Sequence, residues 1–514
     1  MAPRHKEIIR SIVEDNGLRI ELAFTYNPKV FRDRMIPGGR IPGRTETQIR
    51  RTEAQRGETG MNGTKKWVGI ALAVALCLLG SAWSLNAQAP AAGGQDSAPK
   101  YTLVEYNAYK ACEGESNPTA KIKCLDDFVS KYPNSALLNF VYVQYSIAYS
   151  QQKNYPKIIE TADKLAALGD KVDAYTRFQA YLTHVVTYYQ MLADPGNKGK
   201  GLQKDAALAK GTIEAAQNAL KLLPDIKKPE GVADDAWNKQ KAQWPITIND
   251  IAGQAAMNAN DCSGATNFYK AELAVNPDNA VATYQLGRAY YCMTPPQSMD
   301  AFWYMARAVT SKGATQAQSD QVKKFLKGLI ANYQGGNVCD SLIDGEMNEL
   351  LQLAGSSADR PSSYSLPGGA DIGAVQKDMT IASVFNDLKA GGDKSKLTWL
   401  AACGLEFPEV PGKVIEAVPG DPLVLKIAFV TSDAEFDAAT TANMDVKVVG
   451  QPEAARVEKN SAVHFTGTLV AYDPEPFFLH WDKAKVKEED IPKEKGPKKP
   501  PVRRPARKPS GRSS

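Results

Sequence analysis

The spacing of apolar residues changes once along the chain. Through residues 101–355, apolar side chains recur at intervals of three and four, which is the spacing of amphipathic helices. From 412 to 482 the interval becomes two, for example at Leu423, Leu425 and Ile427. The chain is therefore predicted to be mainly α-helical, with a small all-β domain after the helices.

Five short strands are predicted within residues 412–482. The last of them has Phe477, Leu479 and Trp481 on its inner face. The stretch FTGTLVAYDPEPFFLHWDKAKV resembles the final hairpin of an OB-fold-like domain, in which Gly467 would lie at a bend. This resemblance implies a small closed barrel, and a β-sandwich is the alternative.

The helical region contains an internal repeat. Gly253 and Gly287 are 34 residues apart, and Ala265 and Pro277 follow Gly253 by 12 and 24 residues. This layout resembles the tetratricopeptide repeat (TPR), in which a small residue stands where two helices cross and a proline ends the second helix. The resemblance implies that helical hairpins stack into an α-solenoid over residues 101–355. The signature residues are Gly253, Ala265, Pro277, Leu286, Gly287, Tyr290 and Ala301.

A solenoid of this kind has a concave face. The resemblance implies that this face holds a peptide or a segment of a partner protein. Side chains on the first helices of two repeats are the candidates for contacting that partner, although some of them must pack between helices instead. The candidates are Tyr142, Gln144, Tyr145, Tyr284, Gln285, Arg288 and Tyr291.

Residues 61–87 have the three parts of a secretory signal peptide: Lys65 and Lys66, an apolar run at 67–83, and a small polar end. We expect export to the periplasm or beyond, as an exported bacterial TPR protein. An uncleaved anchor at 67–83, in a single-pass inner-membrane protein with a periplasmic body, is the alternative. Residues 1–60 are interpreted as a disordered extension that results from a start codon assigned too early.

Two further segments differ in composition from the predicted domains. Residues 356–411 begin with a stretch rich in Ser, Pro and Gly and are predicted to be a linker with short helices. Residues 483–514 carry twelve Lys/Arg and four Asp/Glu among many prolines, so a disordered basic tail is expected. The chain has a net charge of +5, but its ends and signal segment are so basic that residues 88–482 are left with −9. The net charge is therefore no argument for nucleic-acid binding by the body.

Six cysteines would remain after removal of the signal peptide, and an even number favours disulfides in an exported protein. Spacing alone leaves fifteen sets of pairs open. Cys262 and Cys292 lie in consecutive repeats, each near the end of a first helix, so a disulfide could join two stacked units. Cys112 and Cys124 could likewise close a short helical hairpin.

The sequence offers little catalytic chemistry. Motifs of nucleotide-binding, zinc-protease and serine-hydrolase sites do not occur in it. His184 lies on an apolar helix and is interpreted as a packed residue, whereas His464 and His480 could be neighbours across a hairpin. Two histidines are too few for a metal site. We therefore predict no catalytic residue, no cofactor and no metal, and that the protein is not an enzyme.

The predicted function is that of an exported TPR-repeat scaffold for protein–protein interactions in the bacterial cell envelope. The expected partner is a protein or peptide. The alternative is a module that binds envelope polyanions or nucleic acid through the OB-like domain and the basic tail. We do not expect nucleic acid to be the ligand, because the aromatic residues of the last strand are better explained as core residues.

Overall fold

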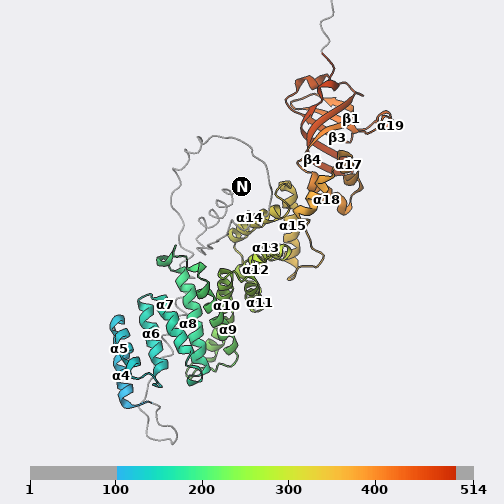
Figure 1. Ribbon diagram of the computed structural model, residues 1–514. Helices are drawn as coiled ribbons and strands as arrows, with labels where there is room; N and C mark the ends of the chain where they lie inside the picture. The colour runs from blue at the N-terminus through green and yellow to red at the C-terminus, as the bar shows by residue number, and fades with distance from the viewer. Residues whose placement is uncertain (1–100, 494–514) are drawn as a thin grey trace, which may run out of the picture. The chain divides into compact units, whose positions relative to one another are not determined.

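The computed structural model describes residues 101–493. It is mostly helical and has a small β-barrel toward its carboxyl end (Figure 1). The predicted extension 1–60, the signal segment 61–87 and the basic tail beyond residue 493 lie outside the described residues. Within 101–493 there is no helix that is both long enough and apolar enough to cross a membrane.

The described residues divide into two compact units. Residues 101–324 together with 353–360 form the first, which we call the helical unit. Residues 325–352 together with 361–493 form the second, which we call the barrel unit. The unit boundary thus differs from the predicted end of the repeat domain at residue 355, because 325–352 group with the barrel.

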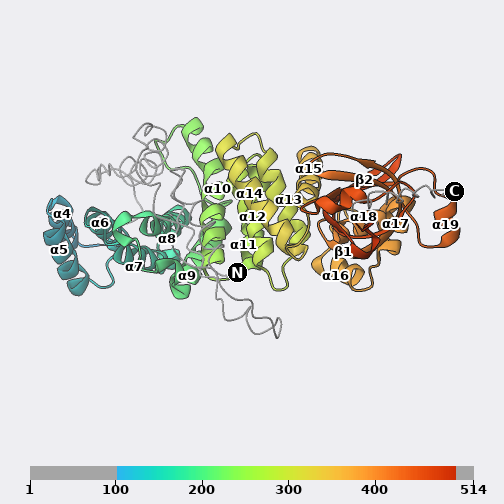
Figure 2. The ribbon, with the colours of Figure 1, turned by 90° about the horizontal axis from the view of Figure 1, so that it is seen from above.

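The helical unit is a series of helices in which each one packs on the next along the chain (Figures 1 and 2). Local sequence determines where many of them begin. The side chains of Asn117, Asp173 and Asn279 each accept hydrogen bonds from backbone N–H groups of the first helical turn. The helices are α4 (Leu103–Gly114), α5 (Pro118–Lys131), α6 (Leu138–Gln151), α7 (Tyr155–Ala166), α8 (Ala174–Ala193), α9 (Ala206–Leu222), α10 (Asp234–Asn258), α11 (Cys262–Val275), α12 (Ala280–Cys292) and α13 (Ser298–Thr310).

Small residues stand where the helices of two pairs cross, as the 34-residue spacing predicted. A Cβ atom at Gly253 of α10 would lie 2.7 Å from the ring of Tyr269 on α11. A Cβ atom at Gly287 of α12 would lie 2.9 Å from the carbonyl oxygen of Ala301 on α13. These contacts are too short for any side chain, so glycine lets the two helices of each pair approach closely.

The barrel unit contains five strands that close into a ring in the order β1-β2-β3-β5-β4. Strands β3 and β5 are parallel, and the other neighbours are antiparallel. The sandwich alternative is therefore wrong, because β1 pairs with both β2 and β4 and leaves no free edge. The strands are β1 (Glu406–Val418), β2 (Leu423–Phe429), β3 (Met444–Val448), β4 (Ala462–Pro474) and β5 (Phe477–Val486).

The alternating residues predicted for the strands form the barrel core. Leu425, Ile427, Leu479 and Trp481 have no exposed surface. The strands extend beyond the predicted limits of 412 and 482, so residues 483–486 belong to β5 and not to a tail. The pairing of β4 with β5 shifts register between Thr466 and Thr468, which places the predicted bend at Gly467.

The predicted linker 356–411 is largely folded. Side chains of α17 and α18, such as Val384, Leu388 and Ala402, lie in the same hydrophobic core as the barrel strands. The short helices expected in this segment are present, and α17 and α18 join the barrel core, because the barrel buries the apolar face of α17. The remaining helices are α14 (Gln316–Tyr333) and α15 (Asp340–Ser356), which both cross the unit boundary, and α16 (Gly369–Lys377), α17 (Ile381–Ala390), α18 (Gly392–Ala402) and α19 (Asp433–Ala438).

The six cysteines of the described residues form three disulfides. Cys112 pairs with Cys124 and joins α4 to α5, with 5.4 Å between the Cα atoms. Cys262 pairs with Cys292, 5.9 Å between Cα atoms, and joins α11 of one helix pair to α12 of the next. Both of these disulfides were considered from the sequence. The predicted position of Cys262 near the end of a first helix is wrong, because Cys262 is the first residue of α11. The third disulfide, Cys339–Cys403, lies within the barrel unit.

Candidate functional site

The candidate residues of α6 are used mainly inside the helical unit. Tyr145 is buried, and its hydroxyl donates a hydrogen bond of 2.6 Å to Asp126 Oδ1 on α5. Burial and the Asp126 carboxylate both raise the pKa of Tyr145. Lys121 Nζ of α5 donates to Gln144 Oε1 at 3.1 Å, and the ring of Tyr142 stacks on that of Tyr145 at 6.4 Å. These residues therefore hold α5 against α6.

The candidates on α12 are also mostly buried. Gln285 and Arg288 are 7% and 8% exposed, and Arg288 Nη1 donates to Gln285 Oε1 at 2.7 Å. The guanidinium carbon of Arg288 lies 5.9 Å from the centre of the half-buried Tyr284 ring. Burial lowers the pKa of Arg288. Tyr291 is the exposed member of this group, at 37%.

Most of the signature residues of the repeat lie in the packed interior between helices. Ala265, Leu286 and Ala301 are almost completely buried, and the ring of Tyr290 stacks on that of Tyr304 with 5.5 Å between their centres. Pro277 follows the end of α11 and precedes α12. Except for the exposed Pro277, these residues are used in packing, so a binding surface must be formed by other side chains of the same helices.

Two acids that sequence reasoning missed lie within α10 and α11. Glu272 has no exposed surface, and its Oε1 accepts a hydrogen bond of 2.6 Å from Asn279 Nδ2. Its Oε2 has no hydrogen-bond partner among residues 101–493. Burial, followed by the charge of Asp250, raises the pKa of Glu272 to about 8. Burial alone raises the pKa of Asp250 to about 6.

Tyrosines surround these acids. The Asp250 carboxylate is close enough to raise the pKa values of Tyr189 on α8 and Tyr269 on α11, after the larger effect of burial on each. Tyr269 is fully buried, whereas Tyr189 is 40% exposed and Asp250 is half-buried. We call Tyr189, Asp250, Tyr269 and Glu272 the acid–tyrosine cluster. Its solvent-accessible members are Tyr189 and Asp250.

Asp250 lacks a counter-charge in the part of the chain that the structure describes. No hydrogen bond or ion pair joins it to another of these residues, and burial is the only cause of its raised pKa. A half-buried carboxylate without a partner is costly and is commonly found where a ligand binds. One sequence signal was available for its neighbour, because Glu272 follows Phe268 and Tyr269 at helical spacing on an apolar face.

The histidines are engaged in local contacts. His184 is buried and its Nδ1 lies 2.7 Å from Asp163 Oδ1, as expected for a packed residue. His464 and His480 are not neighbours, because β4 pairs Ala471, and not His464, with His480. No group of three or more His, Cys, Asp or Glu side chains suited to a metal ion occurs within 101–493.

The acid–tyrosine cluster has the kinds of groups with which proteins recognise a cation. Its carboxyl groups offer acceptors, its exposed tyrosine ring offers a face for a cationic or apolar group, and no nucleophile with an adjacent base accompanies them. Comparisons with known proteins do not extend this assignment: no family model matches the chain, and a search of curated proteins finds no relative.

Proposed function

We propose that this protein is an exported scaffold of the bacterial cell envelope whose helical unit is a TPR-like solenoid that binds a segment of a partner protein. The observation that carries the proposal is the geometry of the 34-residue spacing. Gly253 and Gly287 occupy equivalent crossings, against Tyr269 and Ala301, in two successive helix pairs. Such equivalence is what stacked repeats require, and stacked helical repeats are commonly binding surfaces.

Export is supported by two features. The segment 61–87 has the organisation of a signal peptide. All six cysteines in residues 101–493 are paired, and disulfides persist in oxidising compartments outside the cytosol. The site of action proposed here is therefore the periplasm or the cell exterior, or the periplasmic side of the inner membrane if 67–83 is retained as an anchor.

The partner segment is proposed to bring a Lys or Arg side chain to Asp250. A cation there would supply the counter-charge that the carboxylate lacks, and it would also face the ring of Tyr189. The affinity of such a contact should depend on both residues. Candidate side chains from the sequence that are buried, such as Gln285 and Arg288, would support the groove from behind.

The test is photo-crosslinking in intact cells with a photoreactive amino acid at position 189, followed by mass spectrometry. We expect a small set of envelope proteins to be captured, and capture to fall at least about ten-fold in Asp250→Asn. The matched control is Asp235→Asn, which removes an exposed acid from the same helix. Capture that is equal in all three proteins would contradict a role for the cluster.

One observation supports the alternative function, which is the binding of polyanions. The strand order β1-β2-β3-β5-β4, with β3 parallel to β5, is that of an OB-fold, a barrel that often binds oligonucleotides or oligosaccharides. Binding of polyanions by this barrel and the basic tail should weaken steeply as salt increases, whereas peptide binding at the cluster should weaken less. Measuring the salt dependence of binding for both ligand types separates the two functions.

The charges on one barrel face favour the peptide-binding function. Lys426 Nζ lies 3.5 Å from Asp445 Oδ2, and His480 contacts Asp445 at 2.8 Å and Asp473 at 3.0 Å. Asp445 offsets the charge of Lys426, whose Nζ lies 5.3 Å from the centre of the Phe478 ring. A polyanion would therefore meet little net positive charge at this place on the barrel.

A further inference from the structure

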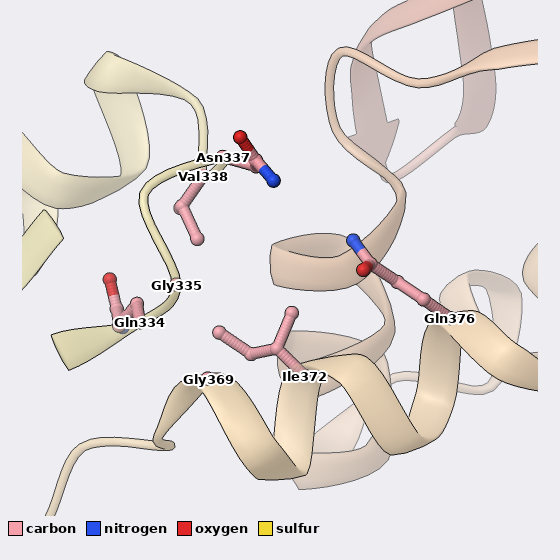
Figure 3. Close-up of a pocket in the computed structure, with 7 residues that line it drawn as sticks. All are labelled: Gln334, Gly335, Asn337, Val338, Gly369, Ile372 and Gln376. Atoms are coloured by element: carbon pink, nitrogen blue, oxygen red, sulfur yellow. The ribbon is translucent and has the colours of Figure 1, made fainter. Parts of the chain in front are cut away.

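The barrel unit contains a small pocket that the proposed function does not use. It lies between the segment that joins α14 to α15 and the helix α16, and it has a volume of about 210 Å³ (Figure 3). Figure 3 shows the amide groups of Asn337 and Gln376 on opposite sides of it, with the side chain of Val338 on the same side as Asn337 and that of Ile372 below them on α16. The lining residues are Gln334, Gly335, Asn337, Val338, Gly369, Ile372 and Gln376.

Gln334 forms a fixed part of the wall of this pocket. The side chain is 2% exposed, and its Nε2 donates to Glu346 Oε1 and Oε2 at 3.0 and 2.8 Å. These bonds hold the amide in place. Gln334 Oε1 has no hydrogen-bond partner among the described residues. This oxygen is itself shielded from solvent, so Gln334 shapes the wall, and the exposed amide of Asn337 is the group that a ligand can reach.

The walls of the pocket are held rigidly. The disulfide Cys339–Cys403 follows Val338 directly and ties this segment to the end of α18. Gln376 Nε2 donates a hydrogen bond of 2.9 Å to the carbonyl oxygen of Ala401. A pocket whose walls are crosslinked in this way loses little conformational entropy when a ligand binds.

Two glycines form a close backbone contact at the wall of the pocket. A Cβ atom at Gly369 would lie 3.0 Å from the backbone nitrogen of Gly335, so these two backbone segments approach each other closely. Gly335 has φ +93°, a conformation that side-chain-bearing residues rarely adopt. The backbones of Gly335 and Gly369 therefore form a tight part of the wall, and the Gly335 N–H is already used in a hydrogen bond of 3.2 Å to the carbonyl oxygen of Asn332.

We propose that this pocket binds one neutral, hydroxyl-rich group, such as a single sugar residue of an envelope glycan. The seven lining residues include no charged side chain, which disfavours phosphates, carboxylates and ammonium groups. Amides both donate and accept hydrogen bonds, as vicinal hydroxyls do. The volume is about seven times the ~30 Å³ that one water occupies, which admits a single ring and not an extended chain.

The test is saturation-transfer NMR on the purified full chain with the methyl glycosides of glucose and N-acetylglucosamine. We expect binding with a Kd on the order of 1 mM for at least one of them. Asn337→Ala should weaken it about five-fold, which corresponds to the loss of one neutral hydrogen bond of ~1 kcal/mol. Asn337 is exposed, so this substitution should leave the fold intact, and an unchanged thermal unfolding curve checks that it does.

The matched control is Gln352→Ala, which removes an exposed amide of α15 away from the pocket and should leave the affinity unchanged. N-acetylglycinamide, a peptide-like amide without hydroxyl groups, tests the rival ligand class. The proposal is overturned if neither glycoside binds, if glycoside binding is insensitive to Asn337→Ala, or if only the amide binds. Because Asn337 and the pocket belong to the barrel unit, failure here would leave the proposed partner binding by the helical unit untouched.

Discussion

Gly253 on α10 meets the face of Tyr269 on α11, and a Cβ atom at position 253 would lie 2.7 Å from that ring. Tyr269 in turn is fully buried beside Asp250 and Glu272. The crossing that makes the repeat compact is therefore also the wall of the acid–tyrosine cluster. The close helix crossing and the proposed binding surface therefore share Tyr269, so a substitution at Gly253 tests the packing at this place.

Gly253→Ala should destabilise the helical unit by about 1–3 kcal/mol, because the added methyl group must displace a packed tyrosine ring. The matched control is Gly211→Ala on α9, where the nearest atom, His184 Cε1, is 3.7 Å from the new Cβ. That substitution should be neutral or stabilise by about 0.5–1 kcal/mol, because alanine favours the helix. Urea unfolding measures both, and equal effects would show that the crossing is not tightly packed.

The buried acid Glu272 should make stability depend on pH. Its pKa is raised from 4.5 to about 8 in the folded protein, so the folded state retains a proton that the unfolded state releases between these values. The free energy of unfolding should therefore be unaffected by Glu272 below about pH 4.5 and fall as the pH rises to about 8. Asp250, with a pKa of about 6, acts in the same direction over a lower range.

Glu272→Gln should remove most of this dependence, since a neutral amide has no proton to lose. We expect the variant to exceed the original protein in stability at about pH 9 and to match it more closely at about pH 5. The exposed acid Glu214 offers the control, because Glu214→Gln should leave the pH profile unchanged. Parallel profiles for Glu272→Gln and the original chain would mean that Glu272 is already ionised when buried.

The disulfide Cys262–Cys292 should stabilise the stacking of α11 on α12. Replacement of both cysteines by serine should cost about 3–4 kcal/mol, the entropy expected for a crosslink between residues 30 apart. Hydrogen exchange read by mass spectrometry should show the loss of protection centred on these two helices. The corresponding double variant at Cys339 and Cys403 should affect the barrel unit instead, and loss of protection in α11 and α12 from that variant would contradict the division into units.

Lys413 should fix the short helix α19 to the barrel. Its side chain is 9% exposed, and its Nζ donates to the carbonyl oxygens of Phe436 and Ala439 at 2.8 and 3.0 Å. Lys413→Met keeps most of the apolar stem but leaves two carbonyls without this donor, so we expect a cost of about 1–3 kcal/mol. Limited proteolysis should then cut within 433–439 faster than in Lys447→Met, a variant at an exposed position of β3. Similar cutting in both would argue against this role.

The apolar periodicity was a good guide to the elements. It predicted the helices of 101–355 and the alternation that buries Leu425, Ile427, Leu479 and Trp481 in the barrel. In the segment 356–411 it indicated short helices, which are present, but it did not show that two of them join the barrel core. The apolar residues of α17 have an ordinary amphipathic spacing, but only the barrel shows what covers them.

The candidate binding residues were harder to predict. Helical spacing placed Tyr145, Gln285 and Arg288 on first helices, but spacing cannot tell a solvent-facing position from one that a neighbouring helix covers. All three are buried. Asp250 was missed for the opposite reason: its place between Ile248 and Ile251 does not show whether it faces solvent or a neighbouring helix. It becomes conspicuous only when its carboxylate is found half-buried without a counter-charge.

The sequence by itself determined the order of helices and strands, the 34-residue spacing of Gly253 and Gly287 and the pairs of cysteines worth considering, because these depend on local periodicity and on chain separation. Tertiary structure alone decided that the strands close into a barrel, that α17 and α18 join its core, and that Asp250 and Glu272 lie near each other. These features depend on contacts between residues distant along the chain and on the exclusion of water, and neither is encoded in the spacing of any one segment.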